Sequence, residues 1–134
     1  MKRSLAYKQL CDGLPLAGSR VQYNDGRYLL IVNGRFVDLT PTEYLLWKLL
    51  YERRARLDQE SDADRFVSYE ELESSTALPR YLVQRHLQNA DLKFQAATPF
   101  RIASVGDLGY ILVARWQPST SRQVEVGRQL AYAV

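Results

Sequence analysis

The residue types that could do chemistry are concentrated in a run of long hydrogen-bonding side chains between residues 79 and 91. At 100° per residue these side chains fall opposite an apolar stripe formed by Val83, Leu87 and Ala90, which Phe94 would continue if the helix extended that far. Side-chain amides can pair with adenine and guanidinium groups with guanine, so a helix with such a face could read base edges in the major groove of DNA. Any amphipathic helix also turns polar residues to solvent, and that interpretation stays open. The polar face consists of Tyr81, Gln84, Arg85, Gln88 and Asn89.

Two further arginines could position a nucleic acid without reading its sequence. Arg80 stands at the start of the same helix, where a contact to a phosphate is favourable. Arg101 is the cation of a predicted hairpin whose tip is Gly106-Asp107. We therefore add Arg80 and Arg101 to the candidate DNA-binding residues.

The sequence contains no recognisable motif for metal binding or catalysis. His86 and Cys11 are the chain's single histidine and single cysteine, and their separation matches no metal-ligand spacing. The acidic residues between 58 and 64 lack the mid-loop glycine and the terminal glutamate of a calcium-binding loop. We find no glycine-rich phosphate loop and no nucleophile elbow. We therefore predict no catalytic residue, no metal and no cofactor, and we do not expect an enzyme.

Capping motifs mark where the helices begin. Thr40, Pro41 and Glu43 form a complete helix start, with a capping hydroxyl, a proline where no N–H is needed, and a carboxylate that can reach back. The helix is predicted to run from Pro41 to about Arg56. Its expected apolar stripe is Leu45, Leu46, Leu49 and Leu50.

A second capping pair, Ser68 and Glu71, predicts a short second helix. The turn that follows leads to the third helix, which carries the polar face and is predicted from Pro79 to about Asp91. We place its end there because Leu92 would point to solvent if the helix continued.

Two parts of the chain carry β-strand patterns. Asp25-Gly26 and Asn33-Gly34 are two-residue hairpin signals, because both central positions of the favoured turn need a positive φ. They divide residues 20–39 into a meander of three strands. Residues 100–105 and 109–114 are predicted to form a closing hairpin.

Composition and charge are those of one soluble domain with an uneven surface. The chain has 134 residues, of which 46% are hydrophobic and 25% charged. No apolar run reaches the roughly 20 residues of a membrane span, and no signal-peptide core is recognisable. A single cysteine excludes an intrachain disulfide, which fits the cytoplasm. Residues 52–73 are net acidic, whereas residues 74–134 carry seven basic and three acidic groups, as a phosphate-facing side would.

Two stretches, Leu39-Thr40-Pro41-Thr42-Glu43-Tyr44-Leu45-Leu46 and Ser104-Val105-Gly106-Asp107-Leu108-Gly109-Tyr110, frame the helical region. Together they resemble the winged helix-turn-helix DNA-binding domain of OmpR/PhoB-type response regulators, over residues 20 to 113. The resemblance implies an α+β fold with an N-terminal antiparallel β-meander, three helices and a C-terminal β-hairpin wing. It also implies that the third helix reads the major groove. The 134 residues leave no room for a receiver domain, so we expect a stand-alone DNA-binding domain.

The sequence departs from that family where DNA affinity would be expected to arise. The recognition helix continues as Gln88-Asn89-Ala90-Asp91 rather than as a basic cluster, and Gly106 stands where the wing usually carries an arginine. Sequence-specific binding of double-stranded DNA by a transcriptional regulator is the leading hypothesis. A winged-helix adaptor for protein–protein interaction, with little or no DNA binding, is the alternative.

The expected organisation has three parts: an N-terminal extension over residues 1–19, the winged-helix domain over 20–114 and a C-terminal tail over 115–134. The tail contains apolar groups that would be unfavourable in water. We therefore expect it to pack on its own domain or to form a homodimer with a second copy. The expected partners are double-stranded DNA, a second copy or another protein, and no membrane. The apolar tail residues are Val124, Leu130 and Val134.

Overall fold

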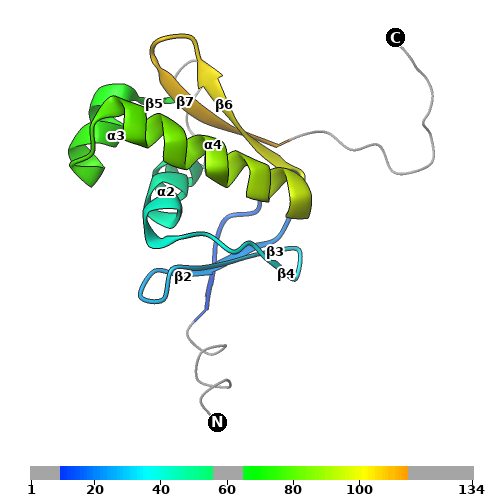
Figure 1. Ribbon diagram of the computed structural model, residues 1–134. Helices are drawn as coiled ribbons and strands as arrows, with labels where there is room; N and C mark the ends of the chain where they lie inside the picture. The colour runs from blue at the N-terminus through cyan, green and yellow to red at the C-terminus, as the bar shows by residue number, and fades with distance from the viewer. Residues whose placement is uncertain (1–9, 56–64, 115–134) are drawn as a thin grey trace, which may run out of the picture.

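The structure of the protein is a computed structural model, which describes residues 10–55 and 65–114 (Figure 1). An N-terminal antiparallel sheet, three helices and a C-terminal hairpin follow one another in these residues, a mixed α+β arrangement that is consistent with a winged-helix layout. None of the helices in the described residues is long and apolar enough to cross a membrane. The helices are α2 (Pro41–Ala55), α3 (Tyr69–Thr76) and α4 (Arg80–Ala97).

The N-terminal sheet has four strands rather than the three that the sequence predicts. The additional strand is an edge strand of two residues, too short to show an alternating pattern, and it lies within the predicted extension over 1–19. Cys11 pairs with Tyr23, and the Gly13 N–H donates to the carbonyl of Val21 over 2.8 Å. The strands, in spatial order, are β1 (Cys11–Asp12), β2 (Val21–Asn24), β3 (Leu29–Val32) and β4 (Arg35–Phe36).

One of the two predicted hairpin turns is confirmed and the other is wrong. Asn33 and Gly34 both have positive φ, at 52° and 82°. The Asp25-Gly26 turn is instead four residues long, and Tyr28 takes the positive φ of 54°. The carboxylate of Asp25 accepts from the Tyr44 hydroxyl over 2.6 Å and is thereby tied to α2 rather than free to sit in a two-residue turn.

The predicted cap of α2 is confirmed. The Thr40 hydroxyl accepts from the Glu43 N–H over 3.2 Å, and the Glu43 carboxylate accepts from the Thr40 N–H over 2.9 Å. The predicted apolar stripe is partly wrong, because Leu45 is 47% exposed and Leu49 is only half-buried. The buried face of α2 instead combines three aromatic residues with two leucines: Tyr44, Trp47, Tyr51, Leu46 and Leu50.

Ser68 serves two elements at once. Its hydroxyl caps α3 by accepting from the Glu71 N–H over 3.1 Å, as predicted. Its backbone belongs to a short strand, β5 (Val67–Ser68), that pairs with β7 and that the sequence did not reveal. The Glu71 carboxylate pairs with Arg53 of α2, so the second half of the capping box holds two helices together.

Helix α4 is longer than predicted. It runs six residues past Asp91 to Ala97, and Leu92 is left 64% exposed on its outer side. The continuation is stabilised by Phe94, which is fully buried, and by β6, against which the second half of the helix packs. The expectation that an exposed leucine would end the helix was therefore wrong, since burial of the next apolar residue outweighs it.

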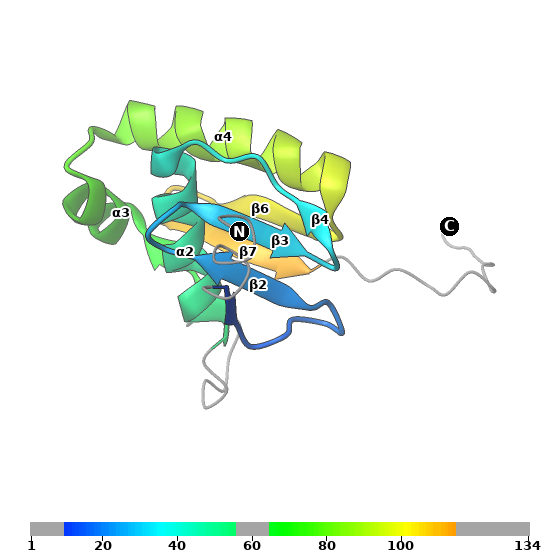
Figure 2. The ribbon, with the colours of Figure 1, turned by 90° about the horizontal axis from the view of Figure 1, so that it is seen from below.

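The C-terminal hairpin has the predicted bounds and becomes a three-stranded sheet through β5. Its strands are β6 (Phe100–Val105) and β7 (Gly109–Ala114), in the order β5-β7-β6. Helix α2 lies between the two sheets and contacts both α4 and β7 (Figures 1 and 2). Trp47 is fully buried at this centre.

Candidate nucleic-acid interface

The outer face of α4 holds four of the seven predicted DNA-binding residues. The helix lies along one edge of the molecule, with α3 beside its first turn and the β6–β7 hairpin alongside (Figures 1 and 2). Tyr81 is 67% exposed, and Arg85 is also exposed. The side chains on this face make no hydrogen bond or ion pair with another described residue. They are Tyr81, Arg85, Gln88 and Asn89.

Gln84 faces α3 rather than solvent. It is half-buried, and its Nε2 donates to the hydroxyl of Tyr69 over 3.1 Å. Tyr69 is buried and packs edge-on against Tyr110, whose pKa is raised to about 12 by burial and by the neighbouring Tyr69 hydroxyl. Gln84 therefore lies at the border of the polar face and helps to dock α4 on α3.

Arg80 is already engaged within the protein. Its Nε donates to the Glu73 carboxylate over 3.2 Å, and its guanidinium lies 4.3 Å from the ring centroid of Tyr69. The charge that was expected to meet a phosphate is thus balanced by an acidic residue of α3. Contact with a phosphate would have to compete with this pair.

Arg101 is held even more firmly, by a bidentate pair with Asp91. Its Nε and Nη2 donate to the two carboxylate oxygens over 3.0 and 3.1 Å, and the Ile102 N–H donates to the same carboxylate over 2.8 Å. Burial alone would raise the pKa of Asp91, but the donors from Arg101, Ile102 and Gln95 together hold it below its ordinary value. Arg101 thus joins β6 to α4 and is not on the outer face.

Helix α4 presents less unpaired positive charge than the number of its basic residues suggests. Lys93 donates to the Glu43 carboxylate over 2.7 Å, and Glu43 is buried at the start of α2. Of the arginines and lysines of α4, Arg85 makes no ion pair with any residue in the described ranges. One unpaired guanidinium therefore dominates the charge of the predicted reading face.

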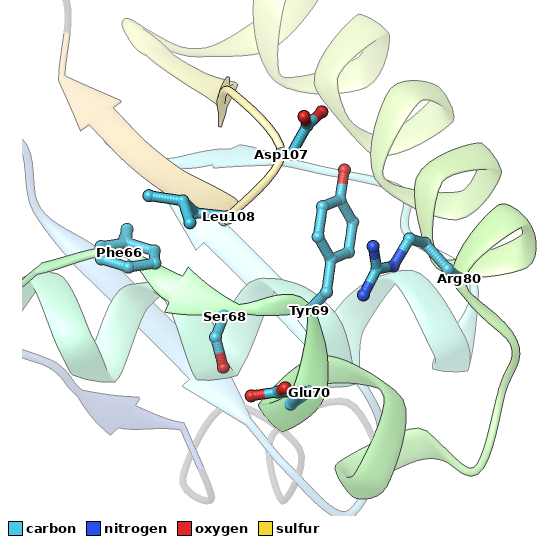
Figure 3. Close-up of a pocket in the computed structure, with 7 residues that line it drawn as sticks. All are labelled: Phe66, Ser68, Tyr69, Glu70, Arg80, Asp107 and Leu108. Atoms are coloured by element: carbon cyan, nitrogen blue, oxygen red, sulfur yellow. The ribbon is translucent and has the colours of Figure 1, made fainter.

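A small pocket beside this face was not foreseen. It encloses about 180 Å³ where β5, the start of α3, the start of α4 and the tip of the hairpin meet (Figure 3). Its residues come from separate parts of the sequence, so no local pattern could have predicted it. They are Phe66, Ser68, Tyr69, Glu70, Arg80, Asp107 and Leu108.

The remaining candidate groups stay separate from this region. Within residues 10–55 and 65–114, no group of three or more His, Cys, Asp or Glu side chains could hold a metal ion. Cys11 is exposed on β1, and His86 is half-buried on the flank of α4. The acidic run from 58 to 64 lies outside the described residues. The prediction that the chain is not an enzyme remains a prediction.

Comparison with known proteins adds no family to this description. No protein-family model matches the chain, and no curated protein matches it. The resemblance to OmpR/PhoB-type domains therefore rests on the sequence motifs and remains a prediction.

Proposed function

We propose that this chain is a cytoplasmic transcriptional regulator that binds double-stranded DNA by placing α4 in the major groove. The observation that carries the proposal is the outer face of α4. Its polar side chains make no hydrogen bond or ion pair with another described residue and can therefore bond a ligand. They are Tyr81, Arg85, Gln88 and Asn89. An 18-residue helix is about 27 Å long, enough to follow the groove across several base pairs.

Each side chain on this face has a role in the proposed complex. The Arg85 guanidinium can donate two hydrogen bonds to one guanine, and the Gln88 and Asn89 amides can both donate to and accept from adenine. Tyr81 can bond a phosphate or contact a thymine methyl group. Because Arg80 and Arg101 are neutralised, we expect modest affinity for random DNA and a larger share of the binding energy from base contacts.

A binding isotherm on duplex DNA tests the proposal. A labelled pool of random duplexes should bind with an affinity that falls between 50 and 200 mM salt, as counterion release requires. Selection from the same pool should enrich a defined sequence. No binding at 50 mM salt, or binding without any enriched sequence, would contradict a sequence-specific regulator.

Arg85→Ala provides the test at a single residue. If Arg85 reads a guanine, the variant should lose about 1–3 kcal/mol of binding free energy on the selected duplex, with the melting temperature unchanged. Arg35→Ala removes the same charge from an exposed position on β4 and is the matched control. Equal losses for both variants would show that only net charge matters and would remove Arg85 from the reading face.

The adaptor hypothesis is favoured by a different observation. Glu70 and Asp107 are exposed beside the start of α4, where carboxylates oppose a DNA phosphate. Leu92 and Leu108 are exposed on α4 and on the hairpin, where they would suit a protein surface. A chain that shows no affinity for duplex DNA but retains a saturable protein partner would support this second function.

A further inference from the structure

The corner pocket combines apolar walls with acidic edges. Figure 3 shows Tyr69 and Leu108 at its centre, with Glu70 and Asp107 on opposite sides of them. Leu108 is 60% exposed at the tip of the hairpin, although its backbone carbonyl accepts from the Tyr69 N–H over 3.0 Å. The backbone of the tip is thus fixed on α3 while the leucine side chain remains available for contact.

The charge of the pocket is negative. Glu70 and Asp107 are exposed, and neither makes an ion pair or hydrogen bond through its carboxylate with another residue in the described part of the chain. The cation in the lining, Arg80, is balanced by Glu73 and lies over the Tyr69 ring. Two carboxylates therefore remain without compensation around an apolar surface.

We propose that this pocket binds an arginine side chain presented by a basic segment of another protein. About 180 Å³ suits one side chain and is below the usual size of a site for a small-molecule ligand or cofactor. The aliphatic part of an arginine would pack on Leu108 and Phe66, while its positive charge would be attracted by the carboxylates of Glu70 and Asp107 on the two sides of the pocket.

The same charge pattern separates this site from a DNA contact. A phosphate placed here would face both carboxylates, and the guanidinium of Arg80 would have to leave Glu73 to reach it. The pocket is therefore a protein-docking site next to the proposed reading face. It does not depend on whether α4 binds DNA, because Glu70, Asp107 and Leu108 lie outside the reading face and the proposed ligand is a cation.

A titration with short peptides, followed by ¹⁵N–¹H NMR on the full chain, tests this inference. The probe is acetyl-Gly-Arg-Gly-amide, and the matched neutral probe replaces arginine by citrulline. The arginine peptide should produce saturable shifts at the amides of Phe66–Glu70 and Asp107–Leu108. The citrulline peptide should produce shifts at least threefold smaller at the same concentration.

Variants identify the groups responsible. The double variant Glu70→Gln and Asp107→Asn should reduce the arginine-dependent shifts at least threefold, while its spectrum keeps the dispersion of the folded chain. Asp38→Asn, which changes an exposed carboxylate outside the pocket, should leave the shifts unchanged. Equal shifts with the double variant would overturn the role of the two carboxylates.

Two further outcomes would overturn the proposed ligand. Equal shifts with citrulline would show that the cation is not recognised. Saturable shifts of the same amides with inorganic phosphate would identify an anion site around Arg80 instead. Loss of DNA binding in Arg85→Ala would leave the arginine-peptide titration unchanged, so failure of one proposal is distinguishable from failure of the other.

Discussion

At the scale of single residues, the basic side chains of α4 divide into those that hold the fold and one that does not. Arg80 and Lys93 are paired with acidic residues of α3 and α2. Arg85 alone among them reaches outward without a described partner. A guanidinium that is free of intramolecular pairs needs no rearrangement to meet a base edge, which is why Arg85 is the most informative position for testing DNA recognition.

Two hydroxyl groups fix the starts of helices, and their removal should lower stability. Thr40→Ala and Ser68→Ala should each reduce the free energy of unfolding by about 0.5–2 kcal/mol, because each loses the hydrogen bond to an otherwise unpaired N–H of the first turn. Chemical denaturation measures the loss. Ser104→Ala, at an exposed position on β6, controls for removal of a hydroxyl. A change no larger than that of the control would contradict the capping role.

At the scale of elements, the attachment of α4 to the hairpin depends on one carboxylate. Asp91 receives donors from the Arg101 side chain and the Ile102 backbone, both in β6. This bond joins the helix that carries the polar face to the strand that leads to the pocket. The relative position of the two proposed binding regions is therefore set partly by Asp91.

The lowered pKa of Asp91 makes this attachment sensitive to acid. A carboxyl whose folded pKa lies below its ordinary value of 3.8 stabilises the protein above that value, and the contribution is lost as pH falls through the folded pKa. The difference in unfolding free energy between the natural chain and Asp91→Asn should be largest near pH 7. It should shrink between about pH 5 and pH 2.

Urea denaturation at a series of pH values measures this difference. Asp38→Asn accounts for the change in net charge, since it removes an exposed carboxylate from the link between β4 and α2. A difference for Asp91→Asn that stays constant from pH 7 to pH 2 would show that the ionised carboxylate does not contribute to stability.

The contact between β5 and β7 requires a glycine. A Cβ at position 109 would lie 2.0 Å from the carbonyl oxygen of Val67, which is backbone and cannot move aside without breaking the strand pair. Gly109→Ala should therefore lower stability by about 1–3 kcal/mol or more. Gly26→Ala is the control, because the nearest atom to a Cβ there is a side-chain oxygen at 3.4 Å. Thermal denaturation that gives equal melting temperatures for both variants would contradict this account.

At the scale of the whole molecule, α2 organises the two sheets. It contacts β7 of the C-terminal sheet, and its aromatic side chains lead from the N-terminal sheet to α4. The Trp47 ring is stacked on Tyr51, with 5.1 Å between the ring centroids, and on Phe94 of α4, with 6.4 Å between the centroids. Tyr23 of β2 meets the same tryptophan edge-on. The N-terminal sheet is thus part of one core with the helices, and it supports α4 through α2.

The tail sequence carries a prediction about assembly. Val124, Leu130 and Val134 lie outside the described residues, and their apolar character favours a dimer or packing on the domain. The full chain should have twice the monomer mass in analytical ultracentrifugation, and a chain that ends at Pro118 should be monomeric. Equal monomeric masses together with equal stabilities would contradict both forms of the expectation.

Local features were readable from the sequence because their determinants lie within a few residues of one another. The caps at Thr40 and Ser68, the turn at Asn33-Gly34 and the bounds of the β6–β7 hairpin all depend on short-range hydrogen bonds and backbone preferences. The apolar spacing of α4 likewise identified its buried side and, with it, the outward position of Arg85.

Only the tertiary structure decided which polar groups remain free, because their partners come from other elements. Arg101 forms an ion pair with Asp91, and Arg80 forms one with Glu73. No local sequence pattern distinguishes a paired arginine from an unpaired one. The length of α4 was decided by burial of Phe94 against the core. The corner pocket exists because the hairpin tip folds onto the start of α3, where the Tyr69 N–H bonds the Leu108 carbonyl across 39 positions of sequence.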